Sequence, residues 1–173
     1  MSKRAGLLAL VLLAGCAAPS DVNARAAAGP ETSEEIARAI HHQVLDHLSR
    51  YGKAVADAHG GKVVVTPQSW DPYNTPLGLG IDSATVTPDG RRLTVGFLGA
   101  KGPATVPCGI DYAAEPVESA VAVVVVLTSH PHNANDMCTL MGYPRTATLT
   151  LDTPLGKRAV LDMVMGLPVP VNG

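Results

Sequence analysis

Histidine is the residue type in this chain with the clearest potential for chemistry, and the chain carries six. His130 and His132 are separated by one proline and lie in a polar stretch that also contains Asp136. Two imidazoles and a carboxylate could supply three ligands to copper or zinc. However, the sequence has no H-E-x-x-H motif, and polar residues around a proline are ordinary in strand connections. We therefore expect a solvated loop and keep a copper or zinc site as the alternative.

The aromatic side chains offer a second candidate site. They make up only 3% of the chain, yet Trp70 and Tyr73 fall within one proline-containing segment. An exposed pair of this kind could bind a glycan, a peptide or a protein surface. The interpretation that we favour gives Trp70 a packing role, in which it covers one open end of the folded domain.

Residues for nucleophilic or acid–base catalysis do not form a known motif. No serine lies in a G-x-S-x-G sequence, and no glycine-rich phosphate loop is present. Glu115 and Glu118 are expected on opposite faces of one strand, where they could not act as a glycosidase pair. The sequence therefore predicts no catalytic residue and no cofactor, and a cell-envelope hydrolase is kept only as a second alternative.

The amino terminus carries the most specific functional pattern. Lys3 and Arg4 precede an unbroken apolar run over residues 5–14. A run of about ten residues is too short to cross a bilayer, but it is typical of a signal peptide. It ends in Leu-Ala-Gly-Cys at residues 13–16, which resembles the bacterial lipobox. The resemblance implies that Cys16 is lipidated, and two acyl chains such as palmitate would hold the protein stably at a membrane.

Cleavage before this cysteine would divide the chain into three regions. Residues 1–15 are predicted to be the signal peptide, residues 16–33 the lipidated cysteine and a flexible tether, and residues 34–173 one domain. Without the two basic residues of the signal, 11 basic residues remain against 15 acidic ones, a net charge of −4. This balance excludes an electrostatic footprint for nucleic acid. We expect attachment to the extracytoplasmic face of the cell membrane through the lipid, with an envelope protein or glycan as partner.

The two remaining cysteines, Cys108 and Cys138, are predicted to form a disulfide. They are an even pair in a chain expected in an oxidising compartment, and their spacing matches no metal or C-x-x-C redox motif. The bond would close a loop of about 30 residues, which the chain-entropy model values at about 3–4.7 kcal/mol. We expect it to link two strands across the two sheets of the domain.

These candidate residues must be positioned by one helix and a series of strands. Apolar residues recur every three or four positions within residues 31–60, as on one face of a helix, although Gly52 could divide it. Strands bounded by glycine and proline are predicted at residues 62–66, 80–87, 91–98, 111–118, 121–128, 145–152 and 158–165, with an edge segment at 169–171. This organisation predicts a mainly β fold, a small immunoglobulin-like β-sandwich of about seven strands with an N-terminal helix.

A set of short motifs runs from residue 79 to residue 171. They are Ser-Ala-Thr-Val (83–86), Pro-Asp-Gly-Arg-Arg-Leu-Thr-Val (88–95), Pro-Cys-Gly (107–109), Val-Glu-Ser (117–119), Gly-Tyr-Pro-Arg-Thr (142–146), Pro-Leu-Gly (154–156) and Pro-Val-Pro (168–170). Together they resemble a group of uncharacterised secreted lipoproteins of high-GC Gram-positive bacteria. The resemblance implies a secreted, disulfide-bonded β-sandwich with no assigned activity. We therefore expect a membrane-anchored exported protein that is not an enzyme but a binding or structural module.

Overall fold

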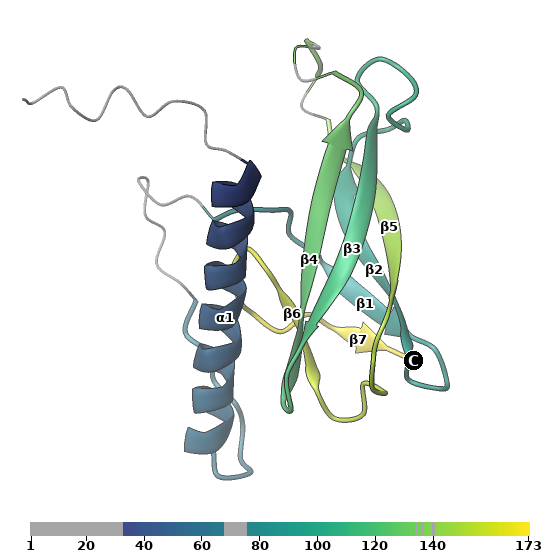
Figure 1. Ribbon diagram of the computed structural model, residues 1–173. Coiled ribbons are helices and arrows are strands. Elements are labelled where there is room, and N and C mark those ends of the chain that lie inside the picture. The colour runs from purple at the N-terminus through teal and green to yellow at the C-terminus, as the bar shows by residue number, and fades with distance from the viewer. Residues whose placement is uncertain (1–32, 68–75, 134, 136, 140) are drawn as a thin grey trace, which may run out of the picture. The chain divides into compact units, whose positions relative to one another are not determined.

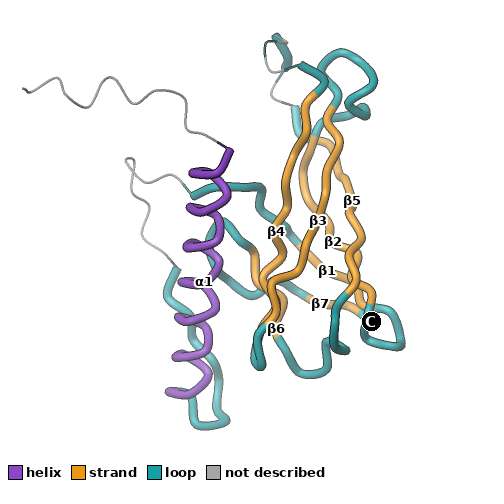
Figure 2. Tube along the Cα trace, viewed as in Figure 1, coloured by secondary structure: helices purple, strands orange, loops and turns teal. Residues whose placement is uncertain are grey.

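The computed structural model describes residues 33–67, 76–133, 135, 137–139 and 141–173 (Figure 1). These residues belong to one compact unit and form one helix and seven strands. The strands make two sheets, and the helix runs beside the sheet that contains β4 (Figure 2). The predicted mainly β sandwich with a helix near its amino terminus is confirmed.

The helix α1 spans Ser33–Asp57. Glu34 and Glu35 occupy its first turn, where carboxylates favour the positive end of the helix dipole. The helix is not divided at Gly52, which lies beside Val121, 3.9 Å from the position that a Cβ would take. Within the described part of the chain, no helix combines the length and the apolarity that a membrane crossing requires.

The seven strands are arranged as a four-stranded and a three-stranded sheet. The first has the order β5-β2-β1-β7 and the second the order β3-β4-β6. Neighbours are antiparallel except for the pairs β1–β7 and β4–β6. The bounds are β1 Ser83–Val86, β2 Arg92–Gly99, β3 Ile110–Glu118, β4 Ala122–Pro131, β5 Tyr143–Thr150, β6 Ala159–Asp162 and β7 Val171–Asn172.

Strand β4 is the central element, because both of its faces are buried. Val123, Val125 and Leu127 point into the core between the two sheets. Ala122 and Val124 point the other way, into a second core beneath α1. A strand covered on both faces needs a continuous apolar sequence, whereas β5 alternates because only one of its faces is covered. The molecule therefore has two apolar layers that share one strand.

Two predicted strands differ from the structure. Residues 62–66 do not join either sheet. They follow α1 and pack on its side of the molecule, where Val63 and Val65 contact the core beneath the helix. The strand predicted at residues 158–165 ends at Asp162, because the carboxylate of this residue accepts a hydrogen bond from the backbone N–H of Met165 at 2.7 Å and turns the chain. Both segments have strand composition, but tertiary contacts decide their structure.

The disulfide joins Cys108 and Cys138, as predicted, with a Cα–Cα distance of 5.6 Å. Both cysteines lie in loops and not in strands. Cys108 precedes β3 of one sheet, and Cys138 precedes β5 of the other. The bond therefore holds together two loops at one end of the sandwich, each of which leads into a different sheet.

Candidate functional site

Several residues singled out from the sequence lie outside the described residues. These are Cys16, Trp70, Tyr73 and Asp136. The predicted lipidation site, the aromatic pair and one of the three candidate metal ligands therefore remain predictions.

The two histidines of the candidate metal loop lie at the end of β4. His130 is exposed and pairs with Asp111 of β3, while His132 follows the strand and is also exposed. The ring of His132 is oriented by a hydrogen bond from its Nδ1 to the carbonyl oxygen of Ala104 at 2.7 Å. Because a carbonyl only accepts, Nδ1 must carry a proton, and in the neutral ring Nε2 then has the lone pair that a metal would need. Among the described residues, no three His, Cys, Asp or Glu side chains are grouped around a shared point.

The loops around the disulfide enclose a shallow hollow of about 480 Å³. Val106 and Met141 line it from the two loops that the disulfide joins, and Lys101 and Tyr143 also line it. The ammonium group of Lys101 is 5.9 Å from the centre of the Tyr143 ring. Met137 nearby is 98% exposed. This end of the sandwich combines apolar and cationic side chains, but no acid, base or nucleophile is brought together there among the residues the structure describes.

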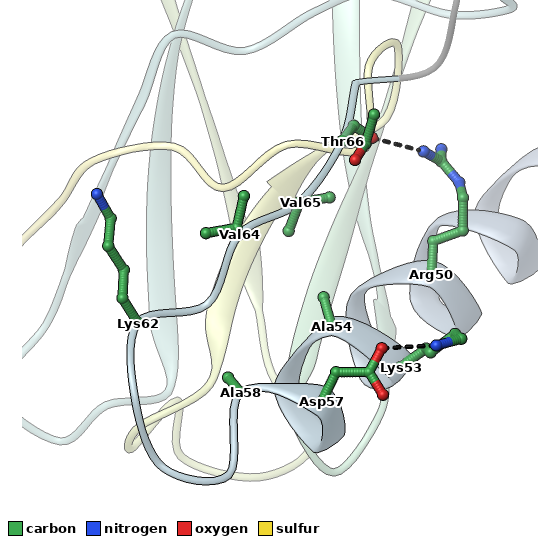
Figure 3. Close-up of a pocket in the computed structure, with 9 residues that line it drawn as sticks. All are labelled: Arg50, Lys53, Ala54, Asp57, Ala58, Lys62, Val64, Val65 and Thr66. Carbon is green, nitrogen blue, oxygen red and sulfur yellow. Dashed lines mark hydrogen bonds and ion pairs between the residues drawn. The ribbon is translucent and has the colours of Figure 1, made fainter.

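A second hollow, of about 410 Å³, lies between the carboxyl-terminal half of α1 and the extended segment that follows it (Figure 3). We call it the helix groove. Its lining residues are Arg50, Lys53, Ala54 and Asp57 from the helix, Ala58 directly after it, and Lys62, Val64, Val65 and Thr66 from the segment. The groove therefore has an apolar interior with three cations and one carboxylate at its edges.

The charged residues of the helix groove are paired along α1, with one exception. Arg50 contacts Asp46 at 2.7 Å, and Lys53 contacts Asp57 at 2.6 Å, both with the four-residue spacing of a helix surface. The Lys53–Asp57 pair is exposed and therefore weak, so the charge of Lys53 stays available to a ligand, whereas Arg50 is also bonded to other groups. Lys62 makes no ion pair with any residue that the structure describes. The helix groove is thus a locally cationic site on a chain whose acidic residues outnumber its basic ones.

Beside the groove lies a buried histidine that the sequence analysis did not identify. His47 has no exposed surface, and its Nε2 donates to the carbonyl oxygen of Met163 at 2.7 Å. Its Nδ1 accepts from Nη2 of Arg50 at 2.5 Å. The ring must therefore be neutral with its proton on Nε2. Burial lowers the pKa of His47 below its ordinary value; the bond to Met163 opposes this effect, and the Arg50 charge adds to it.

His47 is hydrogen-bonded to the turn that follows β6, and the carboxylate of Asp162 stabilises this turn. One of its carboxylate oxygens accepts from the backbone N–H of Ile81 at 3.1 Å, and the other accepts from Met165. The turn then passes through Gly166, whose φ of 67° and close contact with the His47 ring leave no room for a side chain. Gln43 also contacts this turn, since its Nε2 donates to the Met163 carbonyl at 2.6 Å. Hydrogen bonds therefore fix α1 to the turn after β6.

A signal for this buried cluster was present in the sequence. His47 lies three residues after Val44 and four residues before Tyr51, and all three are buried on one helix face. The apolar stripe alone thus identifies the position of His47. Its partners could not be found in this way, because Met163 contributes a backbone carbonyl, which every residue has.

No serine hydroxyl in the described part of the chain is hydrogen-bonded to a histidine. Ser119 uses its hydroxyl for the backbone of Ala122 at the start of β4. The geometry therefore adds no support to a hydrolase. Comparison with known proteins adds no relative, since neither a family model, nor a curated protein, nor a solved structure matches the chain.

Proposed function

We propose that this protein is an exported lipoprotein, held at the extracytoplasmic face of the cell membrane by lipid on Cys16, and that its folded unit is a binding module and not an enzyme. The observation that best supports export from the cytoplasm is the disulfide between Cys108 and Cys138. Disulfides persist in oxidising compartments and are rare in a reducing cytoplasm. The bond uses the two cysteines that remain when Cys16 is assigned to lipid.

The anchor is supported by the amino-terminal sequence. A basic start, a short apolar run and the Leu-Ala-Gly-Cys ending agree with one another, and each is needed for a lipoprotein signal. Residues 16–33 would then connect the lipid to the domain. Their alanine-rich sequence, with proline, glycine and serine, has no hydrophobic period.

The binding role is supported by the helix groove. Its volume of about 410 Å³ lies within the range of ligand sites, and its charged edges surround an apolar interior. The groove has no nucleophile and base in contact with each other among its lining residues. Recognition is therefore the function that its side chains support best.

The anchor is tested by replacing Cys16 with Ala in the full-length protein. We expect the variant to lose acylation and to accumulate as an uncleaved precursor or in the soluble fraction. Membrane fractionation and intact mass measure both effects, with Ser20→Ala in the predicted tether as the matched control. Normal processing and unchanged membrane partition of Cys16→Ala would contradict the lipoprotein assignment.

A copper or zinc site at His130 and His132 is the second candidate. The observation that favours it is the His132 ring, whose Nδ1 bond to Ala104 leaves Nε2 as the ligating nitrogen, an arrangement common in metal sites. Isothermal titration of the full-length protein with Cu²⁺ and Zn²⁺ tests this candidate, using His132→Ala and the distant His42→Ala as a pair. Equal heats for the two variants, or no heat at all, would reject the site.

A further inference from the structure

The segment that forms one wall of the helix groove has the features of a strand without a partner. Along residues 62–66 exposure alternates, with Val63 and Val65 half-buried against the core beneath α1 and the other three residues exposed. Val64 is 72% exposed. Four of the five residues are β-branched, which favours strands. The segment therefore has one face fixed by packing and the other open.

The backbone N–H and C=O groups of this segment are also largely unpaired within the part of the chain that the structure describes. Within the described residues, none of the backbone groups of residues 62–66 takes part in a backbone–backbone hydrogen bond. The carbonyl of Thr66 alone is engaged, by Nη1 of Arg50 at 3.3 Å. An extended edge with unused N–H and C=O groups is a template for pairing with another chain.

The space beside the segment is suited to an extended chain. The helix groove lies between this edge and α1, and Figure 3 shows the segment and the helix on its two sides. Peptides that add a strand to a sheet edge use the same combination, in which backbone bonds supply affinity and pockets for alternate side chains supply specificity. Here Ala54, Ala58 and Val65 would accept an apolar side chain.

The charges at the groove select the type of peptide. Lys62 has no ion pair with any described residue, and Lys53 is held by one exposed pair along the helix. Arg50 adds a third positive charge, although its guanidinium is also bonded to Asp46, His47 and the Thr66 carbonyl. Asp57 is the single carboxylate in the lining. Charge complementarity therefore favours a segment with acidic residues next to apolar ones.

We propose that the helix groove binds an extended, acidic peptide segment of a partner protein, which pairs as a strand with the backbone of residues 62–66. This inference rests on the proposal that the domain is a binding module, but it does not depend on the lipid anchor. Membrane partition of Cys16→Ala and peptide binding are separate measurements, so that either proposal can fail alone.

The test uses the full-length protein purified in a neutral detergent and an array of fluorescein-labelled peptides of eight residues. In these peptides Val or Thr alternates with Glu or Asp, and a matched array carries Lys or Arg in place of the acids. Fluorescence anisotropy should detect binding of the acidic array only. Lys62→Glu should weaken binding about fivefold or more, while Lys101→Glu, an equal charge change beside the disulfide, should leave it unchanged.

Strand pairing is tested with N-methylated versions of the best acidic peptide. Successive residues of a strand direct their backbone groups to opposite edges, so that methylation of the odd or of the even positions blocks one edge only. We expect one of the two series to lose binding about tenfold, because about two hydrogen bonds are removed, and the other to retain it. Equal binding by both series would overturn strand pairing.

Three further results would overturn the proposal. They are binding of neither array, equal binding of the acidic and basic arrays, and equal affinities of Lys62→Glu and Lys101→Glu.

A titration with short-chain phosphatidylglycerol tests whether the groove binds an acidic lipid instead of a peptide. Binding of this lipid that requires Lys62, without binding of the peptides, would assign the groove to an acidic lipid surface instead. Circular dichroism checks that both variants keep the fold, which we expect because both lysines are exposed.

Discussion

The two cores on either side of β4 are stabilised in different ways. The core between the sheets contains only apolar side chains among its buried members, including Leu93, Val95 and Leu127. The core beneath α1 ends at a polar cluster, where His47 and Asp162 are buried and hydrogen-bonded. Apolar packing is not directional, whereas hydrogen bonds require defined partners. The sandwich is therefore held by packing, and the position of the helix is specified by the bonds at its middle.

The sandwich core should give the largest effect when a side chain is removed from it. Leu93 is completely buried, and we expect Leu93→Ala to lower the free energy of unfolding by about 3–5 kcal/mol, because a cavity is left in a packed interior. Urea unfolding followed by circular dichroism measures this loss. Leu98→Ala on the same strand is the control, since Leu98 is 62% exposed. Similar losses of stability for the two variants would contradict the assignment of Leu93 to the core between the sheets.

In the core beneath α1, we expect the largest loss of stability from a substitution in the turn that contacts His47. We expect Gly166→Ala to lower the free energy of unfolding by about 2–4 kcal/mol, from its left-handed backbone and from contact with His47. A Cβ at this position would lie 2.5 Å from Nδ1 of His47. Gly156→Ala separates the two causes, because Gly156 has a similar φ of 56° and no atom within 3.8 Å of the Cβ position. Thermal unfolding should show the smaller loss for Gly156→Ala.

The pH dependence of His47 should give the smallest effect. Its pKa is lowered in the folded protein, so that the unfolded chain binds more protons below pH 6.5, the ordinary value. Stability should therefore be complete above about pH 6.5 and decline as the pH falls toward the folded pKa, by at most about 1.4 kcal/mol per pH unit. Arg50 and Asp46 on the helix and Asp162 at the end of β6 are the charges that act on the ring.

This prediction is measured by urea unfolding between pH 7.5 and pH 5.5. The range stays above the titration of Glu118: burial raises the pKa of this carboxyl, but its bonds to Arg158, Asp152 and Thr153 together outweigh burial and lower the pKa below its ordinary value. His47→Gln should flatten the profile, whereas the exposed His42→Gln should leave it as in the wild type. An unchanged slope in His47→Gln would show that the histidine does not link pH to the attachment of the helix.

The fold was predictable from periodicity to a large extent. The apolar run of β4 and the alternation of β5 both indicated strands, and the Pro-Asp-Gly turn at residues 88–90 indicated the hairpin that joins β1 and β2. The candidate site was less predictable. Residues 62–66 have the composition of a strand, but they pair with no strand in the part of the chain that the structure describes. Composition determines the local preference for an extended chain, while pairing depends on what the rest of the fold places nearby.

The sequence by itself determined the class of the fold, the pairing of Cys108 with Cys138 and the position of the helix along the chain. Each of these depends on local period or on the number of cysteines. Only the tertiary structure decided that β4 is covered on both faces, that His47 is neutral and buried, and that residues 62–66 form one wall of a groove lined by three cations. These features depend on backbone groups and on residues far apart in the sequence, such as His47 and Met163, which no local pattern brings together.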